Sequence, residues 1–196
     1  DNAKLSSVTS DNIEGGEKVA DLLISLGHRR ISYIAGWEGA STQRDREFGF
    51  VTKLNENGIS LFSREVGNFK FDEAQSLVDD IVAEFGTIDV LINNAGILIK
   101  EYQLPAIETS EESILRTFNT NTLGVLRVCK SIVPLMSNGG RIINISSGMG
   151  QLEEMESGST AYRLSKTSLN ALTKILSNEL SPLDIKVNTI CPGWVR

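Results

Sequence analysis

Several residue types that common catalytic and metal sites require are scarce in this sequence. Its 196 residues include one histidine, His28, and two cysteines, Cys129 and Cys191. Because His28 lies in a predicted helix-to-strand turn, a Ser-His-Asp triad and a His/Cys metal cluster are excluded. The cysteines fall in a predicted helix and a predicted strand, which favours buried free thiols over a disulfide.

Long apolar runs and an excess of positive charge are also missing. No stretch approaches the ~20 apolar residues of a membrane span, and the N-terminus has no signal-peptide pattern. The net charge of −6 and the pI near 4.9 disfavour nucleic acid and membranes as partners. The carboxylates of Glu153, Glu154 and Glu156 are expected to lie in a solvated loop, so no metal site is predicted. We expect a cytoplasmic protein made by recombinant expression, and a fragment or processed product because the chain begins at Asp1.

Helical and extended patterns alternate along the chain. Apolar residues at helical spacing predict helices over about 12–26, 42–57, 74–85, 110–136 and 160–180. Runs rich in β-branched residues predict strands over about 30–35, 59–66, 88–93, 141–146 and 185–191. Thr109 and Glu112 are spaced as a capping box for the fourth helix.

This alternation predicts a single α/β domain over residues 1–196. We expect a three-layer αβα sandwich with a parallel sheet of five strands in the order 2-1-3-4-5, which is flavodoxin-like or Rossmann-like. The N-terminal helix, about 12–26, is expected to cover one face of that sheet. It would take the place that a C-terminal helix usually fills.

The part of the chain from about residue 72 carries residues with a specific chemical meaning. Tyr162 and Lys166 are four residues apart, so they share one face of a predicted helix. The lysine ammonium favours the phenolate and lowers a tyrosine pKa that starts near ~10. The tyrosine can then exchange a proton with a substrate hydroxyl or carbonyl near neutral pH. Ser146 follows a predicted strand, at the edge where open α/β sheets bind ligands.

With Asn93-Asn94-Ala95-Gly96, Asn121 and Pro192-Gly193, these residues resemble the short-chain dehydrogenase/reductase family over about 72–196. The resemblance implies four catalytic residues, namely Asn121, Ser146, Tyr162 and Lys166. Ser146 would polarise the substrate oxygen, and Asn121 would hold a water in a proton relay. It also implies cofactor contacts from Asn93, Gly96, Pro192 and Gly193. Since the two long helices commonly pair between subunits in this family, a homodimer is a further expectation.

The part up to about residue 71 resembles a different family, the effector-binding domain of the lactose repressor, which looks like periplasmic sugar-binding proteins. The matching segments include residues 8–12, 26–31, 34–36 and 44–50. In that family an arginine matching Arg46 helps to hold a sugar or purine effector. Only part of one lobe is present, so these residues are expected to serve the fold.

The dehydrogenase resemblance fails at the loop that would hold a nucleotide. The family has a Thr-Gly-x-x-x-Gly-x-Gly loop, where the glycines let the backbone approach a pyrophosphate. Here Gly36 and Gly39 are the candidate cofactor contacts, but Ala40 and Thr42 replace two glycines and Glu38 adds a negative charge. We therefore expect no cofactor, or weak binding of NAD(P) at most.

The leading interpretation of this mixture is an engineered chimera of two family fragments, 1–71 and 72–196, with vestigial dehydrogenase residues and no selected activity. One alternative is an NAD(P)-dependent oxidoreductase that reduces a carbonyl or oxidises a secondary alcohol. A second alternative is a small-molecule binding module of the sugar-effector type. The sequence predicts no particular substrate.

Overall fold

The structure is a computed structural model that describes residues 12–35, 41–66 and 71–191. The chain divides into two compact units, and the division falls between Leu77 and Val78, inside helix α3 (Phe71–Phe85). The first unit contains the elements before that point, and the second contains the elements after it. In the described residues, no helix is both long and apolar enough to cross a membrane.

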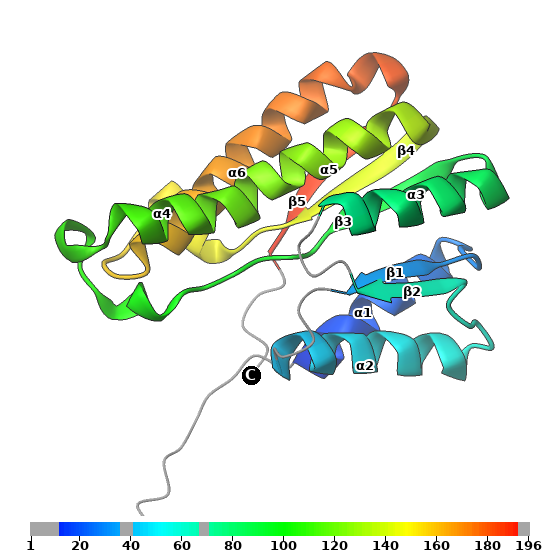
Figure 1. Cartoon of the computed structure of the whole chain (residues 1–196), viewed down its shortest axis with the longest axis horizontal. Helices are drawn as coiled ribbons and strands as arrows, with labels where there is room; N and C mark the ends of the chain where they lie inside the picture. Colours follow the sequence, from blue (N-terminus) through cyan, green and yellow to red (C-terminus); the bar gives the residue numbers. More distant parts are fainter. Residues whose placement is uncertain (1–11, 36–40, 67–70, 192–196) are drawn as a thin grey trace, which may run out of the picture. The chain divides into compact units, whose positions relative to one another are not determined.

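The first unit pairs two helices with two parallel strands (Figure 1). The helices are α1 (Asn12–Ser25) and α2 (Ser41–Glu56), and the strands are β1 (Ser32–Ala35) and β2 (Ser63–Val66). A Cβ at Gly16 would lie 2.1 Å from the carbonyl oxygen of Arg46, and one at Gly49 would lie 2.0 Å from that of Ile13. These two glycines therefore let the backbones of α1 and α2 approach closely. The core of the unit is apolar and contains Ala20, Leu23, Ile31, Ala35, Phe50, Leu54 and Ile59.

Arg46 has a structural contact within this unit. Its Nε donates a 2.9 Å hydrogen bond to Oδ1 of Asn12, which is buried at the start of α1. The bond links α2 to α1 in the same region as the two close glycine contacts. The contact supports the prediction that Arg46 serves the fold.

The second unit is built on three parallel strands in the order β3-β4-β5. They are β3 (Ile88–Asn93), β4 (Met136–Ile145) and β5 (Lys186–Ile190). Figure 1 shows the helices α4 (Glu111–Phe118), α5 (Val125–Ile132) and α6 (Thr160–Glu179) on one face of this sheet. The core between helices and sheet contains Val125, Cys129, Ile142, Leu169, Leu176, Ile185 and Val187.

Short 3₁₀ turns connect these elements. They are η1 (Lys100–Gln103), η2 (Ala106–Glu108), η4 (Val133–Leu135), η5 (Gly148–Gly150), η6 (Leu152–Glu154) and η7 (Ser181–Leu183). The first two lie between β3 and α4, and η5 and η6 lie between β4 and α6. The two connections therefore leave from the carboxyl ends of neighbouring strands.

The long helix predicted over 110–136 differs from the structure in three ways. A π-helical segment, η3 (Asn119–Gly124), separates α4 from α5, and β4 already begins at Met136. The N-cap is Ser110, whose Oγ accepts a 3.2 Å hydrogen bond from the backbone of Ser113. The predicted capping residue, Thr109, instead donates to the carbonyl of Pro105. The cap prediction was therefore wrong by one residue.

The predicted strand neighbours agree with the structure inside each unit, since β1 pairs with β2 and β4 pairs with both β3 and β5. A single five-stranded sheet and a single domain over 1–196 stay predictions. The helix α1 begins and ends within one residue of the predicted range. Its placement over a five-stranded sheet also stays a prediction.

Candidate active site

The candidate site lies at the carboxyl edge of the sheet in the second unit. The parallel strands β3, β4 and β5 all end at this edge, and the connections that follow β3 and β4 begin with small or polar residues. Ser146 continues the pairing beyond β4, because its backbone N–H donates a 2.8 Å hydrogen bond to the carbonyl of Ile190. The pairing of β4 with β5 therefore extends to the predicted catalytic serine.

Tyr162 and Lys166 lie one turn apart in the first half of α6, as the sequence predicted. The Lys166 Nζ lies 5.6 Å from the centroid of the Tyr162 ring. It donates a 2.7 Å hydrogen bond to the carbonyl of Ile145, the last residue of β4, and the lysine is 3% exposed. A buried ammonium needs such partners because burial removes its hydration. The positive charge is thus held between the tyrosine ring and the end of the central strand.

Asn121 is completely buried in the π-helical segment. Its Oδ1 accepts a 2.8 Å hydrogen bond from the backbone of Ile97, and its Nδ2 donates to the Ile97 carbonyl and to Oγ of Ser165, each at 3.0 Å. The side chain therefore ties the turn after β3 to α6. Because both amide hydrogens are engaged, the predicted contact with a relay water must come from other atoms of this residue.

Gly96 lies in the turn after β3, close to the side chains of Asn121 and Lys166. A Cβ at this position would lie 3.4 Å from Oδ1 of Asn121 and 3.5 Å from Nζ of Lys166. The absence of a side chain thus leaves room in front of the amide and the ammonium. Gly96 was predicted as a cofactor contact, and the structure places it beside two of the four predicted catalytic residues.

Ser146 is held by a residue that the sequence reasoning missed. Its Oγ donates a 2.6 Å hydrogen bond to Oδ1 of Asn170, and Nδ2 of Asn170 donates a 3.1 Å bond to the carbonyl of Gly150. Asn170 lies four residues beyond Lys166 on α6, so the same helix spacing that links Tyr162 and Lys166 could have found it. To polarise a substrate oxygen, the Ser146 hydroxyl must turn its hydrogen away from Asn170.

Asn93, predicted as a cofactor contact, directs its side chain into a buried polar network. Its Nδ2 donates a 2.9 Å hydrogen bond to Oδ1 of Asn144, whose Nδ2 donates a 2.8 Å bond to Oγ1 of Thr173. Asn93 Nδ2 also lies 3.7 Å from the Cys129 sulfur. Burial raises the pKa of the Cys129 thiol to about 11, although the contact with Asn93 opposes that shift. The network fixes β3, β4 and α6 to one another below the site.

Both cysteines are free, as predicted, but only Cys129 is buried. Cys191 is exposed because it lies just beyond the end of β5, and its sulfur accepts a 3.0 Å hydrogen bond from the backbone of Gly148. The prediction that both thiols are buried was therefore wrong for Cys191. The other candidate cofactor residues, Gly36, Gly39, Pro192 and Gly193, lie outside the described residues.

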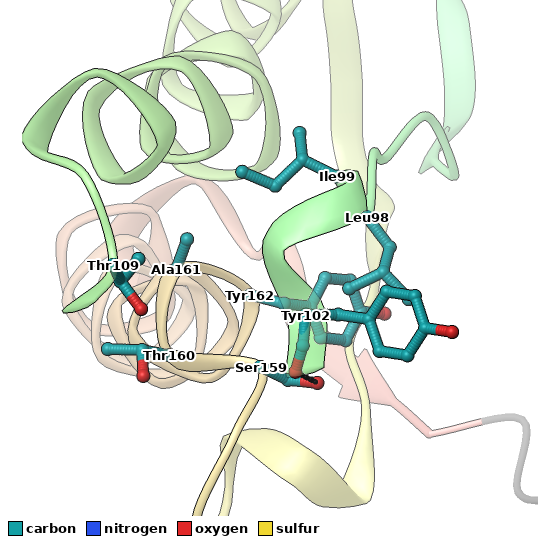
Figure 2. A pocket seen from close by; sticks show the side chains of 8 residues that line it. All are labelled: Leu98, Ile99, Tyr102, Thr109, Ser159, Thr160, Ala161 and Tyr162. Carbon is teal, nitrogen blue, oxygen red and sulfur yellow. Dashed lines mark hydrogen bonds between the residues drawn. The ribbon is translucent and has the colours of Figure 1, made fainter. Parts of the chain in front are cut away.

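A shallow hollow opens beside Tyr162 (Figure 2). It is a surface depression with no enclosed space, and it is lined by Leu98, Ile99, Tyr102, Thr109, Ser159, Thr160, Ala161 and Tyr162. The connection after β3 forms one wall, and the start of α6 forms the other. The Ser159 N–H donates a 2.6 Å hydrogen bond to the Tyr102 carbonyl, so the two walls are tied together. The predicted catalytic tyrosine is therefore one of the residues that border the hollow.

Comparison with known proteins connects this geometry to a family. A family model described as enoyl-(acyl carrier protein) reductase matches residues 35–196. An uncharacterized oxidoreductase from Methylorubrum extorquens is 40% identical over 124 residues, which are 63% of this chain and 48% of that protein. A 3-oxoacyl-[acyl-carrier-protein] reductase from Staphylococcus epidermidis is 29% identical over 194 residues, which are 98% of this chain and 75% of that protein. The chain thus spans about half of the first relative and three quarters of the second.

Solved structures show the same fold. A short-chain dehydrogenase/reductase from Serratia marcescens has a TM-score of 0.72 at 24% identity, covering 94% of this chain and 70% of that one. A xylitol dehydrogenase has a TM-score of 0.70 at 25% identity, covering 92% of this chain and 65% of that one. The Rossmann-like α/β class predicted from the sequence is confirmed.

The chain belongs to the short-chain dehydrogenase/reductase family. This corrects the leading interpretation of the sequence, an engineered chimera without activity. The family model begins at residue 35, and the Staphylococcus relative aligns over 98% of the chain, so both matches cross the supposed boundary at 71/72. None of these matches shows a lactose-repressor part. The alternative reading, an oxidoreductase, is the better supported one.

Proposed function

We propose that this chain is an NAD(P)-dependent oxidoreductase that reduces a carbonyl or oxidises a secondary alcohol. The observation that carries the proposal is the position of Lys166, whose buried ammonium lies between the Tyr162 ring and the end of β4. Asn121 and Ser146 hold the elements around it. This is a proton-transfer site in a family of oxidoreductases.

The side chains divide the chemistry between them. Tyr162 donates a proton to the substrate oxygen in reduction and accepts it in oxidation. The ammonium of Lys166 favours the phenolate form through its positive charge. The Ser146 hydroxyl polarises the same oxygen once its hydrogen has turned from Asn170. NAD(P), when bound, supplies or accepts the hydride.

The described part of the carboxyl edge fits such a cofactor. Ala95 and Gly96 carry little or no side chain beyond the end of β3, so the edge leaves room beside Lys166. Structures of similar fold that contain a nicotinamide cofactor support the proposal: a blue fluorescent protein from a metagenomic library with NADPH, a Burkholderia cenocepacia dehydrogenase with NADP, and the xylitol dehydrogenase with NAD⁺. Gly36, Gly39, Pro192 and Gly193 stay predicted cofactor contacts.

Cofactor titration tests this proposal. NADH and NADPH are added while the enhancement of their fluorescence is followed, and turnover is then measured with a panel of ketones and aldehydes. We expect saturable binding of one cofactor below about 1 mM and its oxidation in the presence of a carbonyl. Tyr162→Phe should keep the binding and lose the turnover. If neither cofactor binds in that range, the proposal is wrong.

We further propose that the chain pairs with a second copy through α5 and α6. Leu164 and Ile175 on α6 are 47% and 52% exposed, and they lie eleven residues apart, which is about three helical turns, so they share a face. Val128 on α5 is also exposed. Exposed apolar residues aligned in this way favour an interface. Analytical ultracentrifugation should show a dimer that Ile175→Glu converts to a monomer, with Lys174→Glu as the exposed control.

A further inference from the structure

The hollow beside Tyr162 is lined entirely by uncharged side chains. Three of its eight lining residues, Leu98, Ile99 and Ala161, are apolar, and the other five carry hydroxyl groups. Such a lining can hydrogen-bond a carbonyl or hydroxyl group and pack against a short apolar chain, but it offers nothing to neutralise a charged group. Any discrimination between charged substrates must therefore come from the surroundings of the hollow.

The two chain segments that contribute lining residues to the hollow are acidic. The connection between Ser146 and Tyr162 carries three exposed carboxylates, and the segment around Thr109 carries three more. We call these six residues the acidic rim: Glu108, Glu111, Glu112, Glu153, Glu154 and Glu156. Two guanidinium groups in the same segments, those of Arg116 and Arg163, offset two of the six charges and leave four. In the sequence between β3 and η2, Lys100 and Glu101 add one charge of each sign and leave this sum unchanged.

The rim is fixed next to the site by Arg163, which directly follows Tyr162. The Arg163 side chain is 9% exposed. Its Nε donates to the carbonyl of Gly158 at 3.1 Å, Nη1 donates to the carbonyl of Glu154 at 3.3 Å, and Nη2 lies 3.4 Å from Oε2 of Glu156. Hydrogen bonds from an ionised donor are stronger than neutral ones, so this arginine holds the segment of 154–158 against α6. The backbone of Glu154 and the carboxylate of Glu156 are thus tied to the helix that carries Tyr162.

One rim carboxylate also reaches toward the catalytic serine. A Cβ added to Gly148 would lie 3.3 Å from Oε2 of Glu154, and Gly148 is two residues beyond Ser146. On the opposite wall, Thr109 lines the hollow between Glu108 and the acidic start of α4. Acidic residues therefore occur in both chain segments that contribute lining residues to the hollow.

We propose that this rim makes the site selective for uncharged carbonyl or alcohol substrates over anionic ones, an inference that rests on the proposed oxidoreductase function. A concentration of like charge around an opening lowers the local concentration of anions and slows their association. The effect reaches about 8–10 Å at moderate salt. A substrate that carries phosphates, or one attached to an acidic carrier, approaches against this field, whereas a free uncharged ketone does not.

Two thioesters with the same reacting group test the proposal. Acetoacetyl-N-acetylcysteamine is uncharged, and acetoacetyl-coenzyme A carries phosphates. We expect a higher kcat/KM for the uncharged thioester at low salt. Added salt should raise the kcat/KM of the anionic thioester and leave that of the uncharged one within about two-fold, because screening weakens repulsion between exposed charges.

Charge-removing variants locate the effect in the rim. The triple variant E153Q/E154Q/E156Q should raise kcat/KM for the anionic thioester about five- to ten-fold at low salt, since each charge at that range changes the interaction about two-fold. With the cofactor at saturation, it should leave kcat/KM for the uncharged thioester unchanged. The matched control D80N/E84Q/E179Q removes three exposed carboxylates outside the rim and should change neither. Equal effects of the two triple variants would overturn the proposal.

A binding measurement separates this inference from the proposed function. Saturation-transfer NMR without cofactor reports whether each thioester contacts the protein, whatever the turnover. If neither thioester is turned over but the uncharged one binds better at low salt, the selectivity stands and the proposed reaction fails. If the anionic thioester binds as well as the uncharged one, or the uncharged one does not bind, the selectivity is wrong.

Discussion

The two units of this protein use different kinds of interior. Among the described residues of the first unit, Asn12 is the one buried polar side chain, and the core is made of aliphatic and aromatic packing and a close helix contact at Gly16 and Gly49. The described residues of the second unit include eleven buried polar or charged ones, which are Asn93, Ser113, Thr117, Asn121, Thr122, Asn144, Ser146, Arg163, Ser165, Lys166 and Thr173. Most of them hydrogen-bond to one another or to strand ends.

This difference suggests a division of roles, in which the second unit holds the predicted catalytic residues and the first unit contributes to stability. Buried polar groups lose free energy unless they are satisfied, so an interior that contains many of them keeps a specific geometry. In the second unit that geometry surrounds Tyr162 and Lys166. Substitutions in the first unit should therefore change stability, whereas substitutions in the second should also change turnover.

The largest effect is expected at Lys166. Lys166→Met removes the charge beside Tyr162 and leaves the carbonyl of Ile145 without its donor. We expect turnover to fall about 10²–10³-fold and the free energy of unfolding to fall by about 1–3 kcal/mol. Lys174→Met, at an exposed position of the same helix, is the control and should change neither. Turnover within about five-fold of the wild type would show that the ammonium has no part in the reaction.

The next largest effect is a loss of stability from a substitution in the first unit. Gly49→Ala places a Cβ 2.0 Å from the carbonyl oxygen of Ile13 and forces α1 and α2 apart. We expect a loss of about 2–3 kcal/mol in urea unfolding. Gly15→Ala is the control, because nothing lies within 4 Å of its Cβ and alanine favours a helix by about 0.5–1 kcal/mol. Equal stability of the two variants would refute the close contact.

A smaller effect is expected from the polar network of the second unit. Asn144→Ala removes the partner of both Asn93 and Thr173. Leaving these groups unsatisfied should lower the free energy of unfolding by about 1–2 kcal/mol. Asn188→Ala, on the exposed side of the neighbouring strand, should stay within about 0.5 kcal/mol of the wild type. A loss as small as that of the control would mean that the network adds nothing to stability.

The effect that is smallest at neutral pH, because it develops only in alkaline solution, concerns the two thiols. Since burial raises the pKa of the Cys129 thiol from 9.0 to about 11, this group stays protonated in the folded state while the unfolded chain ionises. Stability should therefore fall as pH rises from about 9 and level off above about 11. At neutral pH a thiol reagent should modify Cys191 rapidly and Cys129 only on unfolding. Rapid modification of both in the native state would contradict the burial of Cys129.

The sequence was informative where local spacing determines structure. Tyr162 and Lys166 share a helix face by their spacing alone, and strand β3 has the predicted bounds. The π-helical segment was missed because apolar spacing continues through it, although Asn119-Thr120-Asn121-Thr122 are poor helix formers and give a weak signal. Contacts between distant segments, such as Arg163 with the carbonyl of Glu154, leave no local pattern to read.

The chimera hypothesis failed for a related reason. Short motifs up to residue 71 resembled another family, and the altered loop at 36–42 strengthened that impression. Both families alternate strands and helices, so similarity in short segments could not decide ancestry. The match over 98% of the chain reflects the whole pattern and decided it.

The most direct test of the proposed oxidoreductase function is the transfer of deuterium from NAD(P)H labelled at the reactive carbon to a ketone, analysed by mass spectrometry of the alcohol product. The wild-type protein should yield an alcohol with one deuterium on the former carbonyl carbon, and Tyr162→Phe should yield it about 10²–10⁴-fold more slowly. Absence of label in the product of the wild-type protein with saturating cofactor, or an unchanged rate in the phenylalanine variant, would contradict the account.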